Sequence, residues 1–124
     1  MLDGLLDQVR AAGLPVELRI EGEPETLPTG LDLTAYRIVQ EALTNALKHA
    51  RPAQAVVTVR YLGAEVELEV SDDGSGDDGV SGGGHGLIGM RERVAVYGGS
   101  LEAGRRNGGG YELCARLPVG TAGT

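Results

Sequence analysis

The stretch that decides the fold is residues 54–72, QAVVTVRYLGAEVELEVSD. Two runs rich in β-forming residues, 54–62 and 65–72, flank Gly63-Ala64, a connection of the length found in β-hairpins. In the second run, valine and leucine alternate with glutamate, as in a strand with one buried face. The stretch therefore predicts an antiparallel hairpin, and the period of two places Asp72 on its apolar side.

The segments on either side of this hairpin predict further helices and strands. Apolar spacing predicts helices over 2–12, 32–50 and 86–97, a strand over 16–21, and a second hairpin from 100–105 and 110–117. The segments 22–30 and 73–85 are expected to be loops. Because consecutive strand pairs imply hairpins, the predicted fold class is α+β. We expect a two-layer α/β sandwich with its helices on one face of a mainly antiparallel sheet.

The helix over 32–50 has the strongest pattern in the chain. Asp32 or Thr34 is expected to cap it, and Pro52 prevents its continuation. Its predicted apolar face comprises Ala35, Val39, Ala42, Leu43, Ala46, Leu47 and Ala50.

Composition limits the classes of function. The 124 residues suffice for one domain, and the formal net charge of −7 leaves no basic surface for nucleic acid. Cys114 is the single cysteine, so no internal disulfide can form, which fits a reducing cytoplasm. No apolar run approaches the roughly 18 residues of a membrane span, so no membrane contact is expected of this segment.

Asp72 is the first residue that suggests chemistry. A carboxylate on the buried side of a strand needs hydrogen-bond donors, because burying it without them is costly. A purine amino group is such a donor, and Gly74 and Gly76 would let a base lie flat against the backbone. The alternative is an Asp-Gly turn in which Asp72 caps a loop.

The margin of the long helix carries a second set of polar residues. Asn45 offers a carbonyl oxygen to Mg²⁺ without adding negative charge beside a triphosphate, and Glu41 could hold a metal-bound water. Lys48 and His49 follow on the next turn and could contact phosphate. The alternative is that these side chains bond to a neighbouring loop and that Lys48 is simply solvated.

Two glycine runs complete the pattern. GGGHGL at 82–87 opens the helix predicted over 86–97, where free backbone N–H groups and the helix dipole favour phosphate. Its alternative is a flexible loop before a helix. The second run, GGG at 108–110, has a loose hairpin turn as its alternative.

Together these motifs resemble the GHKL ATP-binding superfamily and, within it, the histidine kinase catalytic domain. YRIVQEALTNALKHA at 36–50 resembles the family's N box, and DDGSG at 72–76 its first glycine box. GHGLIGMRERV at 84–94 resembles the second glycine box, and 108–110 the remnant of a third. The resemblance implies the Bergerat ATP-binding fold over residues 14–118, with 1–13 a linker or the end of a missing dimerisation helix and 119–124 a tail.

The resemblance also implies the roles of individual residues. Asp72 would bind adenine, Asn45 would hold Mg²⁺, and Glu41 would position a water or the metal. The remaining nucleotide-binding residues would be Lys48, His49, Gly74, Gly76, Gly84, His85, Gly86, Leu87, Gly89 and Met90. Several residues depart from the family pattern. Tyr111 stands where a threonine often follows the last glycines, Asp73 stands where asparagine is frequent, and Asp77 and Asp78 put negative charge in the lid.

The function implied is the cytoplasmic ATP-binding domain of a two-component sensor kinase, whose parent protein can be membrane-anchored, similar to those that pair with NarL-type response regulators. It would present Mg-ATP to a histidine on a separate domain of the same parent protein, because His49 and His85 both fall inside nucleotide motifs. The alternatives are a stand-alone GHKL serine kinase of the anti-sigma-factor type and a nucleotide-sensing module without catalysis.

Overall fold

The computed structural model describes residues 2–47, 54–73, 84–105 and 110–119. Along the chain these residues form α1 (Leu2–Ala11), β1 (Val16–Glu21), α2 (Thr29–Asn45), β2 (Ala55–Tyr61), β3 (Glu65–Asp72), α4 (Gly84–Val96), β4 (Ser100–Arg105) and β5 (Tyr111–Pro118). Each predicted helix and strand is present, although several boundaries differ. None of the helices in the described part of the chain is long and apolar enough to cross a bilayer.

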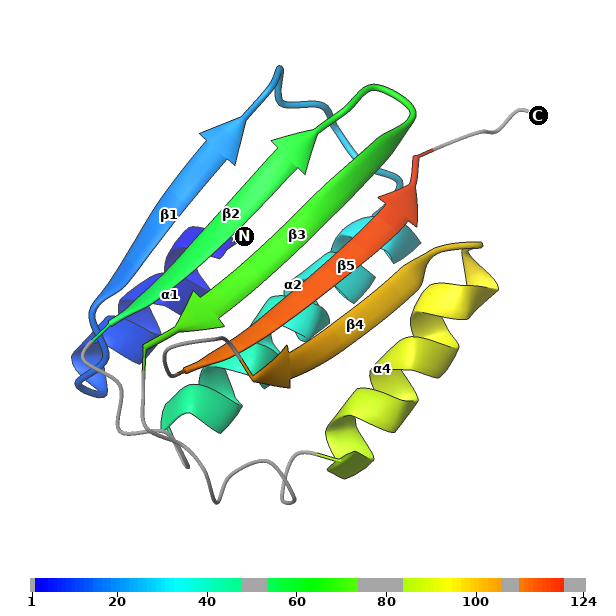
Figure 1. Ribbon diagram of the computed structural model, residues 1–124. Coiled ribbons are helices and arrows are strands. Elements are labelled where there is room, and N and C mark those ends of the chain that lie inside the picture. Colours follow the sequence, from blue (N-terminus) through cyan, green and yellow to red (C-terminus); the bar gives the residue numbers. More distant parts are fainter. Residues whose placement is uncertain (1, 48–53, 74–83, 106–109, 120–124) are drawn as a thin grey trace.

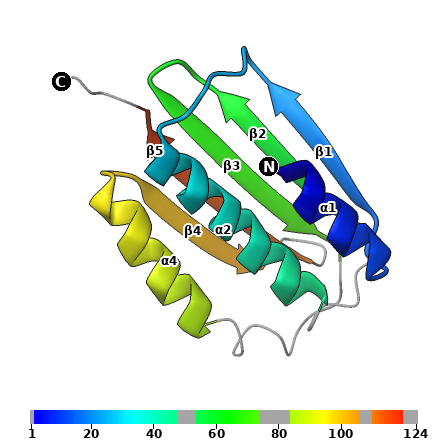
Figure 2. The same cartoon turned by 180° about the vertical axis from the view of Figure 1, so that it is seen from behind.

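The strands form one sheet in the order β1-β2-β3-β5-β4. β1 runs parallel to β2, and the other neighbouring pairs are antiparallel. Figures 1 and 2 show α1, α2 and α4 together on one face of this sheet. The prediction of a two-layer α+β sandwich with a mainly antiparallel sheet is therefore confirmed.

Both predicted hairpins form, but β5 rather than β4 pairs with β3. The burial of the two strands explains this order. β5 places Leu113, Ala115 and Leu117 in the core, each at most 2% exposed, whereas the buried hydrophobic residue of β4 is Leu101. The more apolar strand of the hairpin thus lies inside the sheet, and the other becomes an edge.

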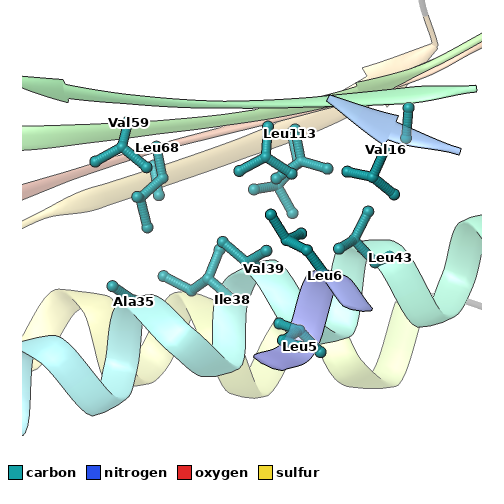
Figure 3. Close-up of a cluster of buried hydrophobic side chains, with 14 of the residues drawn as sticks. Leu5, Leu6, Val16, Ala35, Ile38, Val39, Leu43, Val59, Leu68 and Leu113 are labelled. Carbon is teal, nitrogen blue, oxygen red and sulfur yellow. The ribbon is translucent and has the colours of Figure 1, made fainter. Parts of the chain in front are cut away.

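The core lies between the sheet and the helices. α2 contributes Leu31, Ala35, Ile38, Val39 and Leu43, and α1 contributes Leu5, Leu6 and Val9. In Figure 3, Leu43 points toward Val16, whereas Ala35 lies below Val59 and Leu68. The C-terminal end of α2 is therefore over the end of the sheet where β1 begins.

The start of the long helix differs from the prediction. α2 begins at Thr29 after an extended Pro28 (φ −54°, ψ 147°), and no side chain caps it. The expected cap by Asp32 or Thr34 is therefore wrong; the Thr34 hydroxyl donates to the Gly30 carbonyl at 2.9 Å inside the helix. This bond is open to Thr34 because it lies one turn inside the helix, not before it.

The end of α2 also departs from a regular helix. The α-helix stops at Asn45, and a turn of π-helix occupies residues 46–47. Leu47 is 38% exposed and does not belong to the buried face, whereas Ile38, which the predicted face omitted, is fully buried. A wider π turn changes the direction of the side chains that follow, and such turns are frequent at functional sites.

Candidate functional site

Asp72 is the last residue of β3 and is only 8% exposed. Burial alternates along the strand, so Asp72 shares its face with Val66, Leu68 and Val70. The predicted inward orientation of this carboxylate is confirmed. The carboxylate lies at the end of β3, and because β3 is the central strand, two strands of the sheet lie on either side of it.

A single row of residues crosses the sheet at Asp72. The backbone pairings run from Val16 through Ala55 to Asp72, then to Tyr111 and Arg105. The immediate neighbours of Asp72 in this row are a fully buried alanine on β2 and a half-buried tyrosine on β5. The row begins at Val16, toward which Leu43 of α2 points (Figure 3).

The backbone at the end of β3 makes close contacts on both of its sides. On the β2 side, the Asp73 carboxylate accepts a hydrogen bond from the Gln54 backbone N–H at 3.0 Å, and the Asp73 N–H donates to the Gln54 carbonyl at 3.3 Å. On the β5 side, Gly110 has φ +97°, and a Cβ there would overlap the carbonyl oxygen of Asp72. Asp73 and Gly110 thus hold the backbone around Asp72 in one position.

Glu41 and Asn45 lie on the last two turns of α2 and are both half-buried. This placement confirms that they line the margin between the core face and solvent. Since Leu43 points toward Val16 and Val16 begins the row of Asp72, Asn45 and Asp72 lie at the same end of the sandwich (Figure 3). Lys48 and His49, predicted on the next turn, lie outside the described residues.

The second glycine box forms the start of α4. This helix begins at Gly84, so Gly84 and His85 belong to its first turn and not to the preceding loop as predicted, whereas Gly86 lies in the helix as predicted. The first four N–H groups of a helix have no acceptor within the helix. Figure 1 shows this helix start at the same end of the molecule as the end of α2.

The other predicted site residues are divided between described and undescribed parts of the chain. Leu87 and Gly89 follow in α4; Gly89 is exposed, and a Cβ there would meet nothing within 4 Å. Met90 packs against the core and is half-buried. Gly74 and Gly76 lie outside the described residues. The described parts of the chain contain no cluster of three or more His, Cys, Asp or Glu side chains that would hold a metal.

A groove between α2 and α4 lies away from Asp72 and Asn45. Its volume is ≈ 480 Å³, and it is lined by Gly30, Leu33, Thr34, Gly89, Glu92, Arg93, Val96 and Tyr97. These residues come from the start of α2 and from the middle and end of α4. The groove is therefore remote from Asp72 and Asn45, and of the predicted site residues it includes Gly89 alone.

A comparison with protein families matches most of the chain. Residues 30–121 match the model of the histidine kinase-, DNA gyrase B-, and HSP90-like ATPases. The chain belongs to this family. The resemblance inferred from the N box and the glycine boxes is thereby confirmed, and with it an ATP-binding domain of the histidine kinase type.

Curated relatives are sensor kinases. The chain is 35% identical over 103 residues to the nitrate/nitrite sensor protein NarX of Escherichia coli, which covers 82% of this chain and 17% of NarX. It is 35% identical over 122 residues to the sensor histidine kinase YxjM of Bacillus subtilis, covering 97% of this chain and 30% of YxjM. The chain thus spans less than a third of the length of either relative.

Solved structures share the fold. Full-length ShkA in complex with AMPPNP has a TM-score of 0.72 at 22% identity, covering 100% of this chain and 31% of ShkA. The histidine kinase domain of a blue-light-activated kinase from Erythrobacter litoralis has a TM-score of 0.67 at 22% identity, covering 95% of this chain and 63% of that one.

The sequence did not reveal two contacts of the site. One is the approach of Gly110 to Asp72, and the other is the pairing of Tyr111 with Asp72. The glycine run at 108–110 was a signal for the first. Both contacts depend on the pairing of β5, rather than β4, with β3, and the sequence does not show this pairing.

Proposed function

We propose that this chain presents Mg-ATP for phosphoryl transfer from the γ-phosphate to a histidine on another domain of its parent protein, a two-component sensor kinase. The observation that carries the proposal is the buried carboxylate of Asp72 at the end of the central strand, at the same end of the molecule as the C-terminal end of α2, which carries Asn45 (Figure 1). A ligand placed between them would meet a base-reading group and a metal-binding group together.

Asp72 reads the base in this proposal. Its carboxylate accepts a hydrogen bond from the amino group of adenine. Guanine carries an oxygen at the equivalent place, and that oxygen would face the carboxylate with like partial charge. Because the carboxylate is buried, either interaction is poorly screened by water, so the discrimination between the two purines is strong.

The phosphates are held at the other side of the ligand. The free N–H groups of Gly84 and Gly86 and the positive end of the α4 dipole favour anions there, which compensates for the acidic balance of the chain. Lys48 and His49 are proposed as further phosphate contacts, and Gly74, Gly76 and Gly89 shape the pocket and its lid. His85, Leu87 and Met90 complete the lining.

Mg²⁺ suits the oxygen donors at the end of α2. The half-buried Asn45 supplies a neutral carbonyl oxygen and Glu41 positions a water, so one or two protein contacts suffice, with the remaining ligands from phosphate and water. The metal supplies charge neutralisation, and the protein supplies positioning, which together are what phosphoryl transfer mainly requires.

The domain division follows from the same proposal. Residues 14–118 form the nucleotide-binding unit, 119–124 are a tail, and residues 1–13 lead from the acceptor domain. Since α1 buries Leu5, Leu6 and Val9 in the core, this connection is rigidly joined to the sandwich. A further partner in this proposal is a response regulator of the NarL type, which the similarity to NarX supports. The proposed setting is the cytoplasm, where ATP is available.

The decisive experiment is a calorimetric titration of non-hydrolysable ATP and GTP analogues into the chain and its Asp72→Asn variant. A hydrogen bond to a charged group is worth about 1.5–3 kcal/mol, so the variant should lose roughly 10- to 100-fold in ATP-analogue affinity and most of its preference over the GTP analogue. The matched control is Asp32→Asn at the opposite end of α2. Equal affinity of Asp72→Asn and the unaltered chain would overturn the site assignment.

A second experiment separates histidine from serine kinases. Radiolabelled ATP is incubated with this chain and the acceptor domain of its parent protein. Acid-labile phosphate on a histidine supports the proposal, whereas acid-stable phosphate on a serine of a partner protein supports the alternative of an anti-sigma-factor-type kinase. ATP binding without phosphoryl transfer to either partner would support the remaining alternative, a nucleotide-sensing module without catalysis.

A further inference from the structure

We propose that the ring of Tyr111 forms one wall of the base pocket and sets the affinity of the site for the nucleotide base, independently of phosphates and metal. This inference rests on the proposed function, because it assumes that Asp72 reads a purine. It concerns a residue at which the chain departs from its family, where a threonine is common.

The sheet register places Tyr111 directly beside Asp72. The two residues are paired across β3 and β5, and alternation along β5 puts Tyr111 on the same face as Leu113, Ala115 and Leu117. Side chains paired in this way on one face have Cβ atoms about 4.5–5.5 Å apart. A base that reaches the Asp72 carboxylate therefore comes within reach of the Tyr111 ring.

The strands on the two sides of Asp72 place different side chains beside it. On β2 its neighbour is Ala55, which is 1% exposed and offers only a methyl group. On β5 its neighbour is an aromatic ring. The flat surface that a purine can pack against is consequently on the β5 side.

The Tyr111 side chain is only partly buried by its contacts with the core. The other core-facing residues of β5 are at most 2% exposed, whereas Tyr111 is only half-buried. Tyr111 is the first residue of β5 and lies at the end of the sheet where Asp72 and Asn45 lie. Part of its surface therefore remains open at the place proposed for the nucleotide.

The position of this ring is fixed by the backbone. Pairing with β3 sets the register of Tyr111, and Gly110, with φ +97° and no Cβ, allows the chain to pass close to the Asp72 carbonyl just before it. Tyr111 is also paired on its other side with Arg105 of β4. A tyrosine has few rotatable bonds, so little entropy is lost when its ring contacts a ligand.

The test compares Tyr111→Ala, Tyr111→Leu and Tyr111→Phe by calorimetry with a non-hydrolysable ATP analogue, ADP and inorganic triphosphate, with and without Mg²⁺. Base-to-aromatic contacts typically contribute roughly 5- to 100-fold in affinity. Alanine and leucine should lower the affinities for the ATP analogue and ADP by the same factor in that range, whether or not Mg²⁺ is present. Phenylalanine should lower them far less, and inorganic triphosphate should bind equally to all.

The matched control is Tyr61→Ala. Tyr61 faces the core from β2 but pairs with Val66, at the end of the sheet away from Asp72. Its loss should lower the unfolding midpoint without changing nucleotide affinity. Leucine at position 111 preserves most of the side-chain volume, so a folded variant is available even where alanine unfolds the chain.

Three results would overturn the inference: unchanged affinity in Tyr111→Leu, an equal loss in Tyr61→Ala, or a loss in Tyr111→Phe as large as in Tyr111→Leu. Failure of the proposed function has a different signature, since the unaltered chain would then bind no ATP analogue at all. If Asp72→Asn weakens binding and Tyr111→Leu does not, only the role of Tyr111 is wrong.

Discussion

Gly110 and Asp72 are in backbone contact: a Cβ on residue 110 would overlap the Asp72 carbonyl oxygen. The contact joins the first residues of β5 to the last residue of β3. It also requires a residue that tolerates φ +97°, which is a glycine. The last glycine before β5 therefore supports the carboxylate proposed to read the base.

Gly110→Ala should lower both stability and nucleotide affinity. The left-handed conformation alone costs about 1–3 kcal/mol for a non-glycine residue, and the overlap with Asp72 adds to it. The control is Gly63→Ala, which has a similar φ of +83° but nothing within 4 Å of the new Cβ. Urea unfolding and calorimetry should show that Gly63→Ala loses only stability. Identical behaviour of the two variants would mean that the contact with Asp72 is unimportant.

Asn45→Ala should remove the effect of Mg²⁺ on ATP binding while leaving metal-free binding nearly unchanged. Loss of groups around a bound metal commonly weakens it by roughly 10- to 100-fold, and Asn45 is the proposed protein contact. Titration of an ATP analogue in Mg²⁺ and in EDTA measures the difference. Gln40→Ala, exposed on the same helix, serves as control. A normal Mg²⁺ effect in Asn45→Ala would remove this residue from the metal site.

Leu6→Ala should destabilise the whole sandwich by about 2–5 kcal/mol, because a fully buried leucine leaves a cavity. Leu6 is 1% exposed on α1. The same substitution at Leu62, 53% exposed, should change the unfolding free energy by less than about 1 kcal/mol. Chemical denaturation of both variants is the measurement. A small effect at Leu6 would show that α1 is an attached linker and not part of the core.

Glu67→Gln should lower stability at neutral pH and cease to do so in acid. Burial raises the pKa of Glu67, but hydrogen bonds from Arg60 at 2.9 Å and Arg116 at 3.0 Å outweigh it and hold the pKa below its ordinary value of 4.5. A depressed folded-state pKa stabilises the protein above the unfolded-state pKa, and this stabilisation is lost as pH falls through the folded-state pKa.

The difference in unfolding free energy between the Glu67→Gln variant and the unaltered chain should therefore be largest above about pH 5 and shrink below pH 4.5. Glu65→Gln is the control, since Glu65 lies on the same face of β3 and has no ion pair among the described residues. A difference that is constant with pH would show that the ion pairs of Glu67 do not contribute.

Much of this site was predictable because strand periodicity is a local property. Val66, Leu68 and Val70 alternate with glutamates, and this period of two is enough to predict that Asp72 lies on the buried face. The apolar spacing of α2 likewise placed Glu41 and Asn45 at the margin of its buried face. In both cases, neighbours within a few residues determine the direction of a side chain.

The errors have local causes as well. The start of α2 was misplaced because Pro28 and Thr29 are compatible with either loop or helix, and packing of Leu31 decides between them. Leu47 was assigned to the buried face because a regular helix was assumed, whereas a π turn follows Asn45.

The sequence by itself determined which helices and strands form and which of their faces are mainly buried, because these depend on spacing along the chain. The tertiary structure alone decided that β5 lies beside β3, and so that Tyr111 and Gly110 are the neighbours of Asp72. Strand order depends on which apolar strand is buried most completely when the whole sheet packs against the helices. That is a competition between distant segments, and no local pattern records its outcome.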